Sequence, residues 1–161
     1  MKPTPAMLTG RSNYFEDFQL GDVYQHARGK TVGEIDNVLI TNLVMNTAQA
    51  HFNEHMMVGS PLGHRITFGG VTAALVIGLA MQDTGENALT ELGLDKVRFK
   101  TPVFHGDTLY AFTEVIGKRD SHRSDAGEVH FRHWGLNQKN EVVCEAERRV
   151  LVMRRPSGEK V

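Results

Sequence analysis

Two polar side chains five positions apart, Asn46 and His51, are the residues of this sequence best suited to chemistry. Such a pair can hold one water molecule between an amide and an imidazole, and a histidine can take or return a proton near neutral pH. Downstream, Gly69 and Gly70 precede an almost uncharged run that can begin a helix with unpartnered N–H groups. Those groups can receive a carbonyl oxygen. The combination predicts addition of water beside a polarised carbonyl.

The element expected to carry Asn46 is a helix that begins near Gly33. The run Thr31-Val32-Gly33-Glu34 offers a capping-box start, and apolar residues then recur at helical spacing, at Ile35, Val38, Leu39 and Leu43. Asn46 continues that stripe, so its amide is expected to face inward. Burying an amide unpaired costs about 1–3 kcal/mol, so a bound water or substrate is a candidate partner.

A second helix is expected from Gly69 to Gln82, because its side chains are small and apolar on every side. That composition suits a helix enclosed by a curved sheet. Alternating polar and apolar residues predict strands over 22–32, 95–103, 108–116, 128–136 and 141–153. One buried helix among antiparallel strands is an α+β arrangement.

The motifs resemble those of MaoC-like enoyl-CoA hydratases and dehydratases. Asn46 falls on the family Asp, His51 on the family His, and Gly69 on the glycine that supplies an oxyanion N–H. Phe68 takes the place of the more usual His before that glycine. The resemblance covers most of the chain, from Tyr14-Phe15-Glu16-Asp17-Phe18 through Pro102-Val103-Phe104-His105-Gly106-Asp107-Thr108-Leu109 to the last strand. The Asn-Thr-x-x-x-His form and the Arg-Ile-x-x-Gly-Gly turn look most like the branch acting on mesaconyl-CoA and β-methylmalyl-CoA.

This resemblance implies a hotdog fold, in which two subunits join their sheets edge to edge and build sites between them. It also implies a hydro-lyase acting on an acyl-CoA substrate, with no metal and no further cofactor. Because Asn46 cannot ionise, it would position the water, while His51 would carry the proton and Gly69 would stabilise the thioester oxygen. Arg65, Phe68 and Gly70 are the expected substrate-binding residues.

Three alternatives remain open. His51-Phe52-Asn53-Glu54-His55 matches the zinc motif H-x-x-E-H, although no third ligand is recognisable. A hotdog thioesterase would place an acid in the central helix, where Asp83 is the first carboxylate after Gly70. Since Asn46 replaces an acid, a non-catalytic acyl-CoA-binding relic of a hydratase is the third alternative.

Composition supports one domain over residues 14–156, with a flexible N-terminal arm at 1–13 and a C-terminal tail at 157–161. A net charge of −1, with both signs intermixed, argues against nucleic-acid binding. The lone Cys144 excludes an internal disulfide and is expected to be an inert strand thiol. The N-terminus lacks the apolar segment of a secretory signal, and the longest apolar run is too short to span a bilayer. The cytoplasm is therefore the expected location.

Overall fold

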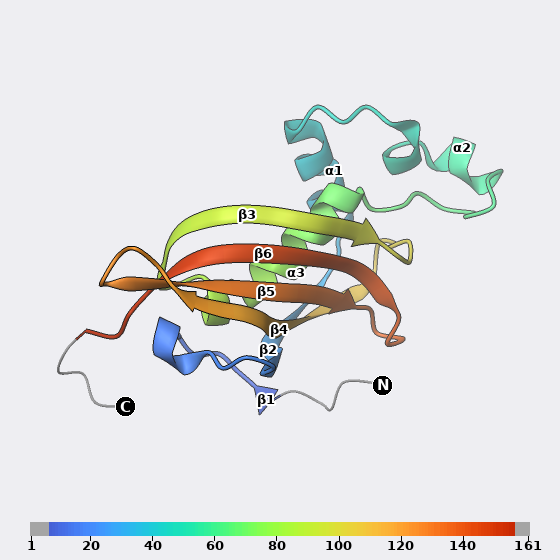
Figure 1. Cartoon of the computed structure of the whole chain (residues 1–161). Coiled ribbons are helices and arrows are strands. Elements are labelled where there is room, and N and C mark those ends of the chain that lie inside the picture. The colour runs from blue at the N-terminus through green and yellow to red at the C-terminus, as the bar shows by residue number, and fades with distance from the viewer. Residues whose placement is uncertain (1–6, 157–161) are drawn as a thin grey trace.

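The computed structural model describes residues 7–156, in which one curved sheet wraps a long helix (Figure 1). Within this part of the chain the sheet has six strands in the order β1-β2-β4-β5-β6-β3. The short β1 runs parallel to β2, and every other neighbouring pair is antiparallel. The α+β prediction is therefore confirmed.

The elements follow one another with short connections. The strands are β1 (Met7–Leu8), β2 (Val23–Thr31), β3 (Ala88–Phe99), β4 (Thr108–Asp120), β5 (Ala126–Leu136) and β6 (Val142–Met153). The α-helices are α1 (Glu34–Leu43), α2 (Glu54–Val58) and α3 (Gly69–Thr84), and two 3-10 turns are η1 (Phe15–Asp17) and η2 (Gln49–His51). The segment containing α1, η2 and α2 extends beyond one end of the sheet (Figure 1).

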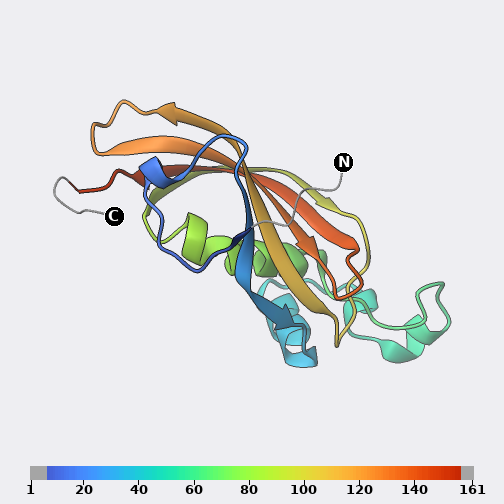
Figure 2. The same cartoon turned by 90° about the horizontal axis from the view of Figure 1, so that it is seen from below.

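Helix α3 lies along the concave side of the sheet (Figure 2). One of its faces, which includes Val71, Val76 and Ala80, is buried against the strands. A Cβ on Gly135 of β5 would overlap the Val76 side chain, so this glycine allows the close approach of helix and sheet. The opposite face of α3 is open, and Ala74 is exposed there. In the single chain the helix is therefore enclosed on the sheet side only.

Each of the five predicted strands corresponds to one of the five long strands of the structure, and the largest difference is in the start of β3. Strand β3 begins at Ala88, seven residues before the expected start at Asp95, and it ends at Phe99. Register shifts with its partner β6 break the simple alternation that would have revealed its first half. Cys144 lies on β6 and is 1% exposed; burial, assisted by the charge of Glu145, raises the pKa of its thiol to about 11. The structure thus agrees with an inert thiol.

The predicted start of α1 near Gly33 is confirmed, but the predicted capping residue and orientation are wrong. Thr31 belongs to β2, and the N-cap is Gly33, whose N–H donates to Asp36 Oδ2 at 2.8 Å. Ile35 and Leu43 are 77% and 73% exposed, so the apolar stripe faces away from the core of this chain. The buried positions of α1 are Asn37 and Thr41, which share one face of the helix because they are four residues apart.

Strand β3 is an open edge of the sheet. It pairs with β6 on one side, and most of its residues are exposed. Its exposed apolar side chains are Leu89, Leu92, Leu94, Val97 and Phe99. Together with the outward face of α1, this edge gives the single chain a large apolar surface of the kind that marks an interface.

A buried polar network fixes the end of α3 to the sheet. Asp83 Oδ2 lies 2.5 Å from His26 Nδ1, and Thr113 Oγ1 lies 2.6 Å from His26 Nε2 and 2.7 Å from His133 Nδ1. Asp83 Oδ1 also accepts the N–H groups of Gly10 and Arg11. Residues 7–13 of the expected arm are thus hydrogen-bonded to the domain, whereas residues 1–6 and the tail 157–161 lie outside the described residues. The division into arm, domain and tail stays a prediction.

Burial and hydrogen bonding act in opposite directions on Asp83. Burial raises the pKa of this carboxyl, but the hydrogen bonds from His26 and the Arg11 N–H outweigh it, so the net pKa is lowered. A carboxyl whose pKa is lowered by folding contributes stability above the unfolded pKa of about 4 and loses it as pH falls through the folded value.

We therefore expect Asp83→Asn to lower the free energy of unfolding at neutral pH by about 1–3 kcal/mol, because an amide cannot accept at both of the positions that bind His26 and the N–H groups of Gly10 and Arg11. Denaturant melts at several pH values measure this. The difference from the wild type should shrink as pH falls below about 4, where the wild-type carboxyl also becomes neutral. Asp95→Asn, at a half-exposed carboxylate paired with Arg149, is the control. Equal stability of the two variants at neutral pH would show that the hydrogen bonds of Asp83 do not stabilise the fold.

Candidate active site

His51 is held in a defined orientation at the end of η2. The residue is 8% exposed, and its Nδ1 lies 3.0 Å from the carbonyl oxygen of Ile66. Because a carbonyl oxygen only accepts, Nδ1 must carry the hydrogen. In the neutral ring, Nε2 then carries the lone pair and can act as a base.

The chain turns from Ile66 directly into the start of α3. Phe68 is the N-cap residue, and its carbonyl accepts the N–H groups of Val71 and Thr72. Among the described residues, the N–H groups of Gly69 and Gly70 have no hydrogen-bond acceptor. A Cβ on Gly70 would overlap the Phe68 ring, so a side chain there would force the ring to move. The helix therefore begins with two donors that have no acceptor within residues 7–156.

The structure brings His51 and this helix start together. The rings of His51 and Phe68 have their centroids 5.4 Å apart, and the Ile66 N–H donates to the Ala50 carbonyl at 3.1 Å. A cavity of about 290 Å³ opens beside Gly69, with Thr67 and Phe99 also in its lining. A proton acceptor, two free N–H donors and an adjoining cavity thus occur within one short region of the fold.

Sequence reasoning missed Asn37, which lies on α1 and is 0% exposed. Its Nδ2 donates to the His51 carbonyl at 3.1 Å, and its Oδ1 accepts the Phe68 N–H at 2.9 Å. A single asparagine in a helical stretch carries no motif. The available signal was the pair of polar residues Asn37 and Thr41, four positions apart and therefore on one face of the helix.

Asn46 lies in the loop after α1 and is half-buried. Its N–H donates to the Thr41 carbonyl, and its Oδ1 accepts the Ala48 N–H at 3.0 Å. This is a local Asx turn, which an aspartate can also form. Within the described chain the Asn46 side chain makes no hydrogen bond to His51, so its part in the site stays a prediction.

Arg65 is already paired with two carboxylates. Its Nε lies 2.9 Å from Glu54 Oε2 and its Nη2 lies 2.9 Å from Glu34 Oε1, and its side chain is 18% exposed. Hydrogen bonds from His64 and Arg65 lower the pKa of Glu54 to about 2. The members of the H-x-x-E-H pattern therefore have separate partners, with His51 bonded to a carbonyl and Glu54 to Arg65. Across residues 7–156, no three His, Cys, Asp or Glu side chains cluster as a metal site requires.

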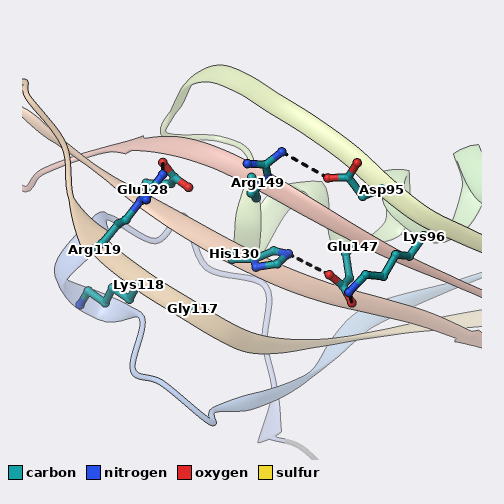
Figure 3. A pocket seen from close by; sticks show the side chains of 9 residues that line it. All are labelled: Asp95, Lys96, Gly117, Lys118, Arg119, Glu128, His130, Glu147 and Arg149. Carbon is teal, nitrogen blue, oxygen red and sulfur yellow. Dashed lines mark hydrogen bonds and ion pairs between the residues drawn. The ribbon is translucent and has the colours of Figure 1, made fainter.

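A larger cavity, of about 710 Å³, lies on the outer face of the sheet, away from α3 (Figure 3). Its lining consists mostly of charged side chains that pair with one another. His130 Nε2 lies 3.1 Å from Glu147 Oε2, and Arg149 Nη2 lies 3.3 Å from Asp95 Oδ2. The smaller region at α3 is the candidate site, because neither His51 nor a helix start belongs to the lining of the outer cavity.

In the described part of the chain, no helix has the length and apolar character needed to cross a membrane.

Comparison with known proteins confirms the fold. A conserved protein of Mycobacterium tuberculosis with a double hotdog fold superposes with a TM-score of 0.82 at 22% identity, over 93% of this chain and 47% of that one. A MaoC-domain dehydratase from Chloroflexus aurantiacus gives a TM-score of 0.82 at 29% identity, over 91% of this chain and 46% of that one. The helix and sheet described above are thus those of a hotdog.

The sequence comparison is more specific. The β-methylmalyl-CoA dehydratase of Chloroflexus aurantiacus is 34% identical over 123 residues, which are 75% of this chain and 35% of that protein. The chain spans less than half the length of the curated relatives it matches. The family model described as mesaconyl-CoA hydratase matches residues 5–154, a range that contains the sheet, the oriented histidine and the glycine start of α3. This chain therefore belongs to the mesaconyl-CoA hydratase family.

Proposed function

We propose that this protein is a hydro-lyase that adds water to a short-chain, branched dicarboxylic 2-enoyl-CoA, or removes it from the matching 3-hydroxyacyl-CoA. The observation that carries the proposal is the orientation of His51. Its Nδ1–H is bound to the Ile66 carbonyl, so in the neutral ring Nε2 carries the lone pair, and the ring lies 5.4 Å from that of Phe68, the N-cap residue of α3. Family membership supports the class of reaction, and the activities for which the relatives are named support the class of substrate.

In the proposed reaction Asn46, His51 and Gly69 have separate roles. Asn46 positions a water molecule, and His51 Nε2 takes one proton from it as its oxygen bonds to C3 of the substrate. The electron pair of the double bond moves toward the thioester, and the Gly69 N–H stabilises the enolate-like oxygen. The proton then returns to C2, so the sum is the addition of one water. Phe68 and Gly70 border the thioester in this arrangement, and no metal or further cofactor is required.

A panel of purified enoyl-CoA and hydroxyacyl-CoA thioesters, incubated with and without a chelator, tests the function. Mass spectrometry should show a gain or loss of one water, unaffected by chelation, with branched dicarboxylic substrates preferred. Release of free CoA would identify a thioesterase. That outcome has little structural support, because Asp83, the first carboxylate of α3, is buried and bonded to His26. Binding without turnover would identify a non-catalytic relic and refute the proposal.

The roles of Asn46 and His51 are separable by substitution. His51→Ala should lower kcat by about 10²–10⁴, the usual contribution of one positioned acid or base, with the circular-dichroism spectrum unchanged. Asn46→Asp restores a carboxylate, which can accept a proton where an amide only orients water, so turnover of unbranched enoyl-CoA should survive or rise. Full activity of His51→Ala on the preferred substrate would show that the site is elsewhere.

Arg65 is proposed to hold the free carboxylate of a dicarboxylic substrate. Since Glu34 is 64% exposed on its side chain, it is the partner that a substrate carboxylate can displace from the guanidinium. Arg65→Gln should then raise KM for a branched dicarboxylic enoyl-CoA at least tenfold while changing KM for an unbranched monocarboxylic one much less, because only the first substrate loses a charge-assisted bond. Equal changes in both KM values would assign Arg65 a structural role only.

The partner that we propose is a second copy of this chain, joined along β3. The edge of β3 has unpaired backbone groups and exposed apolar side chains, both of which a second chain could bury. Antiparallel pairing of two copies along β3 would extend the sheet. Leu94→Arg places a charge on that edge and should shift the protein toward a monomer in light-scattering measurements. Leu20→Arg, at a residue 71% exposed and outside the strand, is the matched control. A wild-type monomer at high concentration would refute the pairing.

A further inference from the structure

Asn37 joins the two halves of the candidate site to a third element. Its amide nitrogen donates to the carbonyl of His51 at 3.1 Å, and its amide oxygen accepts the N–H of Phe68 at 2.9 Å. Its oxygen also accepts the hydroxyl of Thr41 at 3.2 Å, one turn along α1. The three bonds therefore connect α1, the residue that carries the imidazole and the residue that caps α3.

The surroundings of Asn37 indicate that these bonds have a purpose beyond core packing. Asn37 and Thr41 are both 0% exposed, whereas the apolar residues Ile35 and Leu39 of the same helix are 77% and 55% exposed. The helix thus places polar side chains inward and apolar ones outward in this chain. A buried amide stabilises little unless its bonds are made, since each unmet group costs about 1–3 kcal/mol. Such departures from local rules occur most often at functional sites.

The groups that Asn37 binds determine where the reacting atoms lie. The carbonyl of His51 fixes the backbone from which the imidazole projects, and the N–H of Phe68 fixes the backbone immediately before the free Gly69 N–H. The hydrogen bond from His51 Nδ1 to the Ile66 carbonyl joins the same two segments. A shift between them would change both the separation of base and oxyanion donor and the geometry that fixes the imidazole tautomer.

We propose that Asn37 is a positioning residue, which holds His51 and the first turn of α3 at the separation that water addition requires. This inference rests on the proposed function for its kinetic consequence. A misplacement of about 1 Å in such an arrangement can cost about 10² in rate. Because Asn37 touches no substrate atom, its loss lowers kcat and leaves KM nearly unchanged.

Asn37→Ala and Asn37→Asp test the proposal, with Thr41→Val as the matched control. Thr41→Val removes the third hydrogen bond at an equally buried position and keeps both bonds to the site. We expect Asn37→Ala to lower kcat about 10²-fold with KM within threefold of the wild type, and Thr41→Val to change kcat less than threefold. Melting temperatures of both variants show whether the comparison is made at similar stability. A kcat loss in Asn37→Ala no larger than in Thr41→Val overturns the proposal.

Asn37→Asp adds a measurement, the pH dependence of kcat, that would not respond if Asn37 only stabilised the fold. A protonated carboxyl presents one donor and one acceptor, as the amide does, whereas the ionised form can no longer donate to the His51 carbonyl. The ratio of kcat for Asn37→Asp to kcat for the wild type should therefore rise as pH falls through the pKa of the introduced carboxyl. A ratio that does not change with pH contradicts the proposed donor role. If Asn37→Ala does not fold, this ratio decides the kinetic question.

A measurement without turnover separates this inference from the proposed function. Ring nitrogen resonances of His51, assigned by their loss in His51→Ala, report which nitrogen carries the proton. We expect the Nδ1–H form in the wild type and Thr41→Val, and a mixture of both tautomers in the Asn37 variants. If the wild type turns over no thioester, the proposed function fails, and the spectra still decide the role of Asn37. An unchanged tautomer in the Asn37 variants overturns that role.

Discussion

The hydrogen bond between His51 Nδ1 and the Ile66 carbonyl is the interaction on which the site depends. It joins the loop after α1 to the segment that enters α3, and it assigns the hydrogen of the imidazole to one nitrogen. Without it, the ring could present either nitrogen to a substrate. With it, a neutral imidazole has its lone pair on Nε2, and its ring packs against Phe68, the residue that precedes the first N–H groups of α3.

The sheet and α3 make this arrangement possible by fixing the helix end. Val76 packs against Gly135 in the middle of the helix, and Asp83 is bonded to His26 at its C-terminal end. Both anchors hold α3 along the concave face of the sheet, and the segment that contains α1 and α2 lies near the N-terminal end of this helix (Figure 1). The rigid part of the fold thus positions one group of the site, and a loop of irregular structure brings the other group to it.

Local patterns predicted the α+β arrangement and the start of α3, whereas the hotdog fold and the proposed roles of His51 and Gly69 followed from the family resemblance. The glycine pair before an apolar run predicts a helix start, and alternation predicts the strands that surround it. The orientation of α1 could not be obtained in this way, since the spacing of Ile35 and Leu43 defines an apolar face without saying what covers it. In the single chain that face is open, and polar residues take the inward side. Asn37 was missed because its bonds reach 14 and 31 residues along the chain, beyond any local pattern.

We propose that this site adds the oxygen of water to C3 of an enoyl-CoA, with His51 as the base. The most direct measurement is the fate of heavy oxygen when the wild type and His51→Ala act on an enoyl-CoA in labelled water. We expect the wild type to yield an intact CoA thioester with one labelled hydroxyl at C3, and His51→Ala to form the same product far more slowly. Label found in a released carboxylate together with free CoA, or a labelled hydroxyl formed equally fast by both proteins, would contradict it.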